Sequence, residues 1–428
     1  MEQAAENSQS QTSLPPGARC VFVNRYYFPY LSATSQLLTD LAIATAQAGF
    51  ETVVVASRMQ YADGDARSPA HEFVDRVRVF RIWTTHFGRK NLLSRALDYL
   101  SFYLSAFVAL MLTVRPRDIV VAKTDPPLIS IIAGVVSRIR GTRPVNWLQD
   151  FFPEVAVRLR LLSEGVLFRL TRALRNLSLR IARLNVPIGG RMAKMPCEEG
   201  IPVDSIAIIS NWADGKLVAP IQHVQNPLRS AWALEHRFVV EASGNLGRAH
   251  DTATTLAAAQ RLAGDPNIVF LLIGGGAGSD RLRAQAQELG LTNLQFQPYQ
   301  VRARLSQSLD VPDVHLVPLL PDLEGLIVPS KVYGICAAGR PCVFIGAPDG
   351  DAAEMLAQDG FGVMVQPGDD AGLARAILEL RENGERRRMQ SDVARTVFEA
   401  RCSRERATSW WHAPLSEIVG ECRKTVGA

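Results

Sequence analysis

The sequence predicts an α/β protein built from two doubly wound lobes, each with a parallel sheet covered by helices on both faces. Short apolar runs alternate with helical stretches, and a polar link at 211–237 separates two such cycles. A chain of 428 residues is also too long for one typical domain. We expect a disordered tail at 1–18, a first lobe at 19–215, a second lobe at 216–402 and a returning helix at 403–428.

The first lobe is predicted from apolar runs that turn residues separate from helical stretches. Such short runs indicate buried strands. The strand segments are RCVFVN, ETVVVAS, RVRVFRI, DIVVAK, PVNWLQ, LNVPI and SIAIIS. The helical segments are 34–48, 92–114, 128–140, the basic region 155–183 and a stretch from Gly190.

The second lobe repeats this alternation. Its strand segments are RFVVEAS, IVFLLI, LQFQPY, VHLVPL, CVFIGA and GVMVQ. Helices follow the strands, and the last stretch, with Trp410 and Trp411, is expected to pack back on the first lobe. Ligands of open α/β sheets bind beyond the carboxyl ends of the strands, so we expect the two lobes to face each other across a cleft.

Composition narrows the classes of partner. The formal charge of +5 is modest for this length, which argues against nucleic acid. The six cysteines are scattered without a CxxC pair, and residues 1–18 lack an apolar run. We therefore expect reduced thiols in a cytoplasmic protein.

Two segments bear on a membrane. Residues 97–114 are just long enough to cross one, but they include Asp98, and we expect a buried or interface-dipping helix rather than a span. The region 155–183 has seven arginines and a single acidic residue, Glu164, with leucines between them. This pattern favours a helix lying on anionic lipid, at the inner face of the plasma membrane. The alternative is a solvated arginine face on a core helix.

The segment 321–341, PDLEGLIVPSKVYGICAAGRP, predicts an acidic loop that leads into a short helix. Pro329 and Ser330 suit its start, and Gly339 suits the residue just past its end. Lys331 then adds a full positive charge to the exposed N–H groups of the first turn. This is a place to hold a phosphate, although an ordinary capped helix with a solvated lysine would have the same sequence.

A second candidate is the turn after RFVVEAS, which contains Gly244, Asn245, Arg248 and His250. Glycines allow close approach of a ligand to the backbone, and the arginine fork suits a diphosphate. The competing interpretation is a strand-to-helix loop with a surface arginine.

Other motifs carry less weight. The run 274–279, GGGAGS, fails the dinucleotide pattern because Ser279 replaces the third glycine, and we expect a tight turn. The DGD triplets at 63–65 and 349–351 lie among turn formers, and Asp351 suits a helix cap. We expect no metal at either triplet. Asp150 ends a predicted strand, where it can meet a sugar hydroxyl or cap a helix.

Together these motifs resemble the family-four retaining glycosyltransferases of the GT-B fold, which has two Rossmann-like lobes. The resemblance covers about 19–400 and is greatest to the branch that builds bacterial exopolysaccharide and O-antigen on a lipid carrier. It depends on SNWAD at 210–214, SGNLGRAHD at 243–251 and EGLIVPSKVYGICAAGRP at 324–341.

The resemblance implies that the second lobe binds a UDP- or GDP-sugar and that no further cofactor is needed. Gly244, Asn245 and His250 match the family's diphosphate turn, in which both usual cations are replaced; Arg248 is expected to supply the charge. Gly334 stands where the family has its second glutamate. Glu324 lies two residues before the first. The donor-binding set is Gly244, Asn245, Arg248, His250, Tyr299, Gln300, Glu324, Ser330 and Lys331.

On the acceptor side, Ser32 and Ala33 match a glycine-rich loop, and Asp150 matches a His-Asp pair with Gln149 in the histidine's place. The implied acceptor is a lipid-linked saccharide. In the expected mechanism its hydroxyl attacks from the face that the diphosphate leaves, and the leaving oxygen takes the proton. Lys331 stabilises the leaving group while Asp150 and Glu324 hold sugar hydroxyls, without a metal.

Two alternatives stay open. A nucleotide-sugar epimerase can share this architecture, although we cannot place its acid and base on opposite sides of a sugar. A silent scaffold that binds a nucleotide sugar or a membrane partner fits the replaced glutamate and cations.

Overall fold

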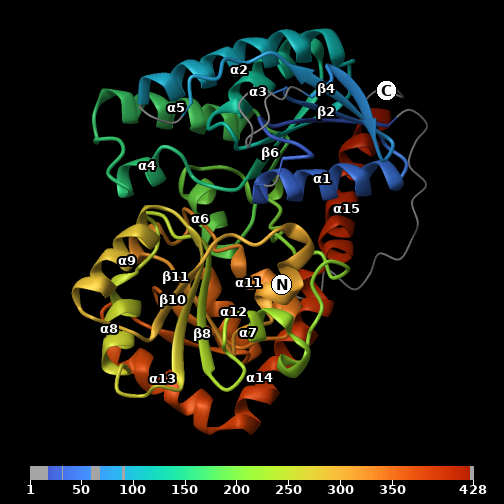
Figure 1. The fold of residues 1–428 in the computed structure, drawn as a ribbon. Coiled ribbons are helices and arrows are strands. Elements are labelled where there is room, and N and C mark those ends of the chain that lie inside the picture. The colour runs from blue at the N-terminus through green and yellow to red at the C-terminus, as the bar shows by residue number, and fades with distance from the viewer. Residues whose placement is uncertain (1–17, 31, 59–67, 89–91, 425–428) are drawn as a thin grey trace. The chain divides into compact units, whose positions relative to one another are not determined.

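The computed structural model describes residues 18–30, 32–58, 68–88 and 92–424, and it confirms two α/β units, each built on its own sheet (Figure 1). We describe each unit by itself, and the expected cleft between the lobes stays a prediction. Unit 1 contains the described residues of 1–147, 174–186 and 408–428, and unit 2 contains 148–173 and 187–407.

Unit 1 has a seven-stranded sheet in the order β3-β4-β2-β1-β5-β6-β7. Strands β4, β2, β1, β5 and β6 run parallel, and β3 pairs antiparallel with β4 at the edge. The strands are β1 Arg19–Val23, β2 Glu51–Ser57, β3 His71–Val74, β4 Val77–Ile82, β5 Ile119–Lys123, β6 Arg143–Leu148 and β7 Leu184–Pro187.

Unit 2 has a six-stranded sheet in the order β10-β9-β8-β11-β12-β13, with every pair parallel. Helices cover both faces of such a parallel sheet. Its strands are therefore buried on both sides and read as continuous apolar runs. The strands are β8 Phe238–Asn245, β9 Ile268–Gly275, β10 Leu294–Gln297, β11 Val314–Pro318, β12 Cys342–Ile345 and β13 Gly362–Val365.

The helices lie between the strands and at the end of the chain. They are α1 Ala33–Gln47, α2 Leu92–Thr113, α3 Ile129–Arg140, α4 Glu154–Arg158, α5 Val166–Ile181, α6 Gly190–Glu198, α7 Pro227–Ala231, α8 Ala253–Arg261, α9 Ala277–Glu288, α10 Leu305–Leu309, α11 Lys331–Ala338, α12 Asp351–Asp359, α13 Asp370–Glu382, α14 Gly384–Val397 and α15 Arg404–Lys424. Within unit 1, Trp411 of α15 packs edge-to-face on Trp147, with ring centroids 5.0 Å apart.

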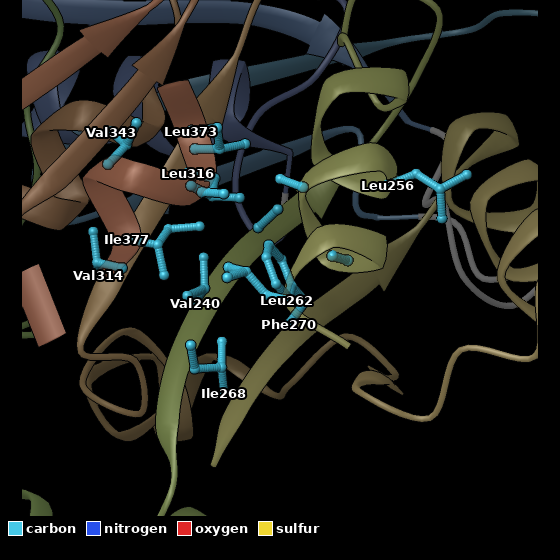
Figure 2. Close-up of a cluster of buried hydrophobic side chains, with 14 of the residues drawn as sticks. Val240, Leu256, Leu262, Ile268, Phe270, Val314, Leu316, Val343, Leu373 and Ile377 are labelled. Carbon is cyan, nitrogen blue, oxygen red and sulfur yellow. The ribbon is translucent and has the colours of Figure 1, made fainter. Parts of the chain in front are cut away.

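The core of unit 2 lies on both faces of its sheet. Figure 2 shows one face, where Val240 and Phe270 pack with residues of α8 and α13, including Leu256 and Ile377. Alternate residues such as Leu271 belong to a second buried cluster on the other face. Burial on both faces fixes the register of the strands, because a slip of one residue would exchange the two faces.

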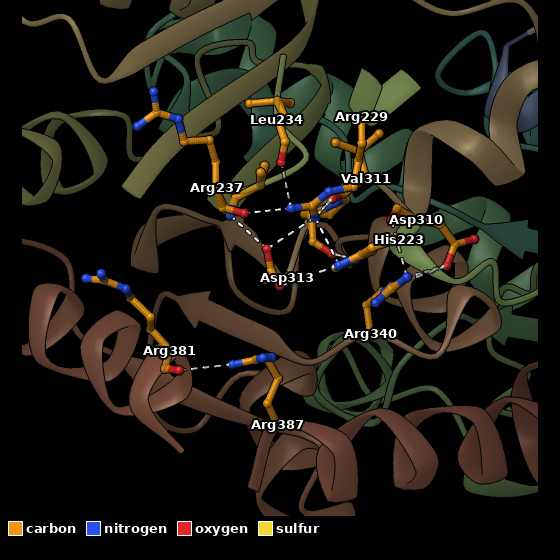
Figure 3. A network of polar contacts seen from close by, with 12 residues as sticks. His223, Arg229, Leu234, Arg237, Asp310, Val311, Asp313, Arg340, Arg381 and Arg387 are labelled. Atoms are coloured by element: carbon orange, nitrogen blue, oxygen red, sulfur yellow. Dashed lines mark hydrogen bonds and ion pairs between the residues drawn. The ribbon is translucent and has the colours of Figure 1, made fainter. Parts of the chain in front are cut away.

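In unit 2, a buried arginine side chain hydrogen-bonds to the loops that precede β8 and β11. Arg229 of α7 donates to the carbonyl oxygens of Leu234 at 2.9 Å and Val311 at 2.7 Å, and it pairs with Asp313 at 3.3 Å (Figure 3). Asp313 in turn accepts from the backbone N–H of Val239 at the start of β8. This network holds the entry to β8 and β11, the two central strands that lead to the site.

Three sequence-based expectations were wrong in detail. SIAIIS forms no strand; Ile206 is an isolated bridge residue, and Ile209 donates to the carbonyl of Pro187 at 3.1 Å. The antiparallel strand β3 was missed, since its four residues give too short an alternation. The region 155–183 forms two helices, α4 and α5, separated at 159–165 where Gly165 and Ser163 interrupt the helical pattern.

Candidate functional site

The ends of β8 and β9 meet through glycines that no other residue could replace. An ideal Cβ on Gly274 would lie 2.3 Å from the carbonyl oxygen of Gly244, and one on Gly276 would lie 2.2 Å from Oδ1 of Asn245. Both glycines have φ values in the left-handed region, at 124° and 107°. The glycine run therefore forms the expected tight turn, and it packs directly against the turn that follows β8.

Lys331 lies over the end of β8. An ideal Cβ on Gly244, whose φ is 98°, would lie only 3.0 Å from Cε of Lys331. Nζ of Lys331 lies 3.5 Å from Nε2 of His250. The structure thus brings together three predicted donor-binding residues, which come from β8, the loop after it and the first residue of α11.

The ring of His250 lies at this point. Its Nδ1 is 3.1 Å from the backbone nitrogen of Gly247 and 3.4 Å from the carbonyl oxygen of the same residue, so the ring tautomer decides whether Nε2 donates or accepts. Burial, and then the charge of Lys331, lowers the pKa of His250 to about 4, so the ring is neutral near pH 7. A neutral imidazole and an ammonium therefore lie within hydrogen-bonding distance of each other.

A buried pair lies deeper in the sheet, and sequence reasoning missed it. Glu241 of β8 is fully buried and stands in register with His315 of β11, with Oε1 and Nδ1 3.8 Å apart. Burial raises the pKa of Glu241 to about 8, against the lowering effects of Ser243 and Lys331. Burial also lowers the pKa of Lys331 to about 8, against the raising effect of Glu241. A charged residue inside the apolar run RFVVEAS was the available signal.

The other predicted donor-binding residues lie around this point. Arg248 is exposed on the same turn and, within the described part of the chain, makes no hydrogen bond or ion pair. The ring of Tyr299 lies against Gly274, 3.1 Å from its ideal Cβ position, and is 60% exposed. Gln300 donates to the carbonyl of Pro298 at 2.9 Å. Ser330 precedes α11, but its side chain makes no capping hydrogen bond.

Glu324 belongs to a second polar group, at the start of α12. Its carboxyl carbon would lie 2.4 Å from a Cβ on Gly350, so the carboxyl group lies directly against the backbone there. Burial, and then the charges of Asp351 and Asp349, raises the pKa of Glu324 to about 7, while Arg191 lowers it. Near pH 7 this side chain is therefore balanced between a charged acceptor and a neutral donor.

Both aspartates of the second DGD triplet, 349–351, contact Arg191 of α6. The guanidinium pairs with Asp349, and the backbone N–H of Arg191 donates to Oδ1 of Asp351 at 2.8 Å. Asp351 therefore sits at the start of α6 and does not cap its own helix, whose N-cap is Gly350. The first triplet, 63–65, lies outside the described residues. Among the residues that are described, no group of three or more His, Cys, Asp or Glu could hold a metal ion.

One segment, 320–331, connects these groups. Leu320 donates to the carbonyl of Ala249, beside His250, and Phe151 donates to the carbonyl of Leu326, both at 2.9 Å. Asp150 is exposed and forms an antiparallel bridge with Ile327. Asp150, Glu324 and Lys331 are thus held by the same segment of unit 2.

Next to Asp150, Gln149 and Asn211 form a reciprocal amide pair with both distances 3.0 Å. This pair satisfies the side-chain amides of both buried residues. In unit 1, Ser32 caps α1 by accepting from the N–H of Ser35 at 3.2 Å, and Ala33 is the first residue of that helix.

Comparison with known proteins bears on the family and on the fold. Residues 227–397 match the family model described as glycosyl transferases group 1. The chain is 29% identical over 296 residues to the probable glycosyltransferase WbjE of Pseudomonas aeruginosa, covering 69% of this chain and 74% of that protein. It is 27% identical over 305 residues to the putative colanic acid biosynthesis glycosyl transferase WcaI of Escherichia coli K12, covering 68% and 74%.

Among solved structures, Anabaena Alr3699/HepE, crystallised with UDP and glucose, superposes with a TM-score of 0.69 at 17% identity, covering 94% of this chain and all of that one. A trehalose 6-phosphate synthase from Burkholderia multivorans superposes with a TM-score of 0.71 at 16% identity, covering 96% and 99%. The fold is therefore that of the GT-B glycosyltransferases. Residues 227–397 of the chain resemble the group 1 glycosyltransferases, in agreement with the resemblance seen in the sequence.

Proposed function

We propose that this protein is a glycosyltransferase that moves a sugar, with retention of configuration, from a UDP- or GDP-sugar to a lipid-linked saccharide in bacterial surface polysaccharide synthesis. The similarity to WcaI, a putative colanic acid biosynthesis glycosyl transferase, supports the polysaccharide role. We further propose that the protein works at the inner face of the plasma membrane, where the basic region 155–183 attracts anionic lipid.

The observation that carries the proposal is the convergence of Lys331 and His250 at the end of β8. The ammonium of Lys331 can only donate, and a diphosphate oxygen can accept from it beside the neutral ring of His250. Because Gly244 has no side chain, the backbone of β8 next to Lys331 is not covered by one. The exposed Arg248 lies two residues from His250, where its planar fork can reach the same diphosphate.

The remaining residues divide the work of transfer. The first turn of α11 and Lys331 stabilise the charge that develops on the leaving diphosphate. Glu324 and Asp150, tied to the segment 320–331, orient sugar hydroxyls of donor and acceptor. If the acceptor hydroxyl attacks from the leaving-group face, its proton passes to the departing phosphate oxygen and the chain needs no separate base.

The test is incubation of the purified protein with UDP- and GDP-sugars, with and without a lipid-linked saccharide. Free nucleoside diphosphate that forms only with acceptor, together with a product of unchanged anomeric configuration by NMR, supports the proposal. An isomerised donor would instead support an epimerase, and binding without turnover would support a scaffold. We expect activity to survive EDTA, and a strict Mg²⁺ requirement would contradict the metal-free mechanism.

A further inference from the structure

Helix α2 of unit 1 has an apolar face that no other described part of the chain covers. Its exposed side chains recur at intervals of three or four residues, so they form one stripe along the whole helix. They range from 42% exposed at Leu97 to 81% exposed at Leu112. The stripe is Leu93, Leu97, Leu100, Leu104, Val108 and Leu112.

The opposite face of α2 is fixed to the sheet. Phe102, Ala106 and Leu110 are fully buried and belong to a core cluster with Val53 and Val55 of β2. Residues 93–113 are long and apolar enough to cross a membrane, and 28% of their apolar 18-residue stretch is buried in the protein. A span would pull the three buried side chains off the sheet, which would expose their core partners. The helix is therefore suited to lie along an apolar surface.

The apolar surface continues over neighbouring elements of unit 1. Val135 and Ile139 of α3 are exposed, and Ile181, partly exposed at the end of α5, lies 3.4 Å from the ideal Cβ position of Gly134 in α3. At the other side, exposed Phe87 donates its backbone N–H to Asp98 of α2 at 3.0 Å. Exposed aromatic side chains at the edge of an aliphatic surface are typical of a membrane interface.

The charged residues around this apolar surface indicate which partner it binds. Within α2, α3 and residues 174–181, the single acidic residue is Asp98, which is buried and pairs with Arg25 at 3.5 Å. Exposed arginines in the same elements are Arg95, Arg138 and Arg180. A second copy of this chain would place like charges opposite one another, whereas anionic lipid headgroups complement them.

We propose that α2, with α3 and the end of α5, is the surface by which the protein docks on an anionic bilayer, with α2 lying flat and its leucines inserted between headgroups. At about 1.5 Å per residue, the helix offers an apolar line on the order of 30 Å long. The contact of Arg25 with Asp98 and with the ring of Tyr99, 5.2 Å from its centroid, connects this surface to the carboxyl end of β1. The inference deepens the proposed use of a membrane-bound acceptor.

Vesicle flotation without donor or acceptor tests the docking separately from transfer. The full chain is mixed with phosphatidylcholine vesicles, with and without 30 mol% phosphatidylglycerol. Wild-type protein should bind the anionic vesicles, and Leu104→Ser/Val108→Ser should reduce the partition coefficient at least tenfold. Val203→Ser/Val224→Ser, which changes two exposed valines of unit 2, should change it less than twofold. Thermal unfolding should show that both variants are folded.

A depth measurement distinguishes a flat helix from a span. Nitroxide labels are placed at Leu93→Cys, Leu104→Cys and Leu112→Cys in a chain with Cys197→Ser and Cys422→Ser, and their depth is measured by electron paramagnetic resonance. Equal, shallow depths at the three sites support docking, whereas a central label deeper than both ends overturns it in favour of a span. Absence of wild-type vesicle binding, or a dimer that Leu104→Ser/Val108→Ser dissociates, would also overturn the proposal.

Discussion

Nζ of Lys331 and Nε2 of His250 lie 3.5 Å apart beside Gly244, the residue before the last of β8. The ammonium can only donate, whereas the neutral ring accepts from it when the ring proton is on Nδ1 and is a second donor when the proton is on Nε2. Burial lowers the pKa of both groups, which shows that the protein itself solvates this positive charge poorly. A bound diphosphate would remove that penalty.

The first prediction concerns the strength of donor binding. Lys331→Ala should weaken UDP-sugar binding by about 1.5–3 kcal/mol, the contribution expected of a hydrogen bond to a charged group, and Arg248→Ala should act in the same direction. Isothermal titration calorimetry measures both. Lys216→Ala, at an exposed lysine elsewhere in unit 2, is the control. Equal affinities for wild type and Lys331→Ala would refute the diphosphate assignment.

The second prediction is a pH dependence of donor binding. Because burial lowers the pKa of Lys331 to about 8, the ammonium is present below pH 8 and is lost as the pH rises above that value. Affinity for UDP should therefore fall between pH 7 and 9, by up to about tenfold per pH unit at the upper end. Lys331→Arg keeps its charge throughout this range and should give a flat profile. A wild-type profile as flat as that of the arginine variant would show that Lys331 does not titrate there.

The third prediction uses two glycines of one turn. Gly244→Ala places a methyl group 3.0 Å from Cε of Lys331 at a φ of 98°, so it should displace the lysine and cost about 1–3 kcal/mol of stability. Donor affinity should fall at least tenfold. Gly247→Ala is the matched control, because a Cβ there meets nothing within 4 Å. If both variants bound donor equally well, close approach at Gly244 would be irrelevant.

Sequence periodicity predicted most of the fold because each buried strand of a doubly wound sheet is a short apolar run. It failed where pairing depends on distant partners: SIAIIS is as apolar as a strand, but it hydrogen-bonds to Pro187 through Ile209 without forming a strand. The position of Lys331 could be predicted from helix-start chemistry. The burial of Glu241 against His315 could not, since a strand pattern does not show which charged residue has a partner on the next strand.

This buried pair gives the fourth prediction. The pKa of Glu241 is about 8 in the folded protein, above its usual value of 4.5, so between these values the folded state holds a proton that the unfolded state has lost. Wild-type stability should therefore fall as the pH rises, by at most about 1.4 kcal/mol per pH unit. Glu241→Gln lacks this titration. Its thermal midpoint should therefore rise relative to that of the wild type when the pH increases from 5.5 to 8. Exposed Glu382→Gln, the control, should show the same difference from wild type at both pH values.

The last prediction separates sugar recognition from diphosphate binding. Glu324 lies against Gly350 at the start of α12, whereas the diphosphate is assigned to Lys331 and His250. Glu324→Gln should therefore lower kcat/KM at least tenfold and weaken binding of the UDP-sugar, while leaving the affinity for UDP within twofold of wild type.

The pH profile makes this test sharper. Burial and nearby carboxylates raise the pKa of Glu324 to about 7, so the carboxylate fraction grows from pH 6 to 8. If the charged form accepts a hydrogen bond from a sugar hydroxyl, kcat/KM should rise through about pH 7 in the wild type and lose that rise in Glu324→Gln. An equal loss of UDP and UDP-sugar affinity in the variant would mean that Glu324 supports the fold of the site rather than the sugar, because a residue that contacts only the sugar leaves nucleotide binding unchanged.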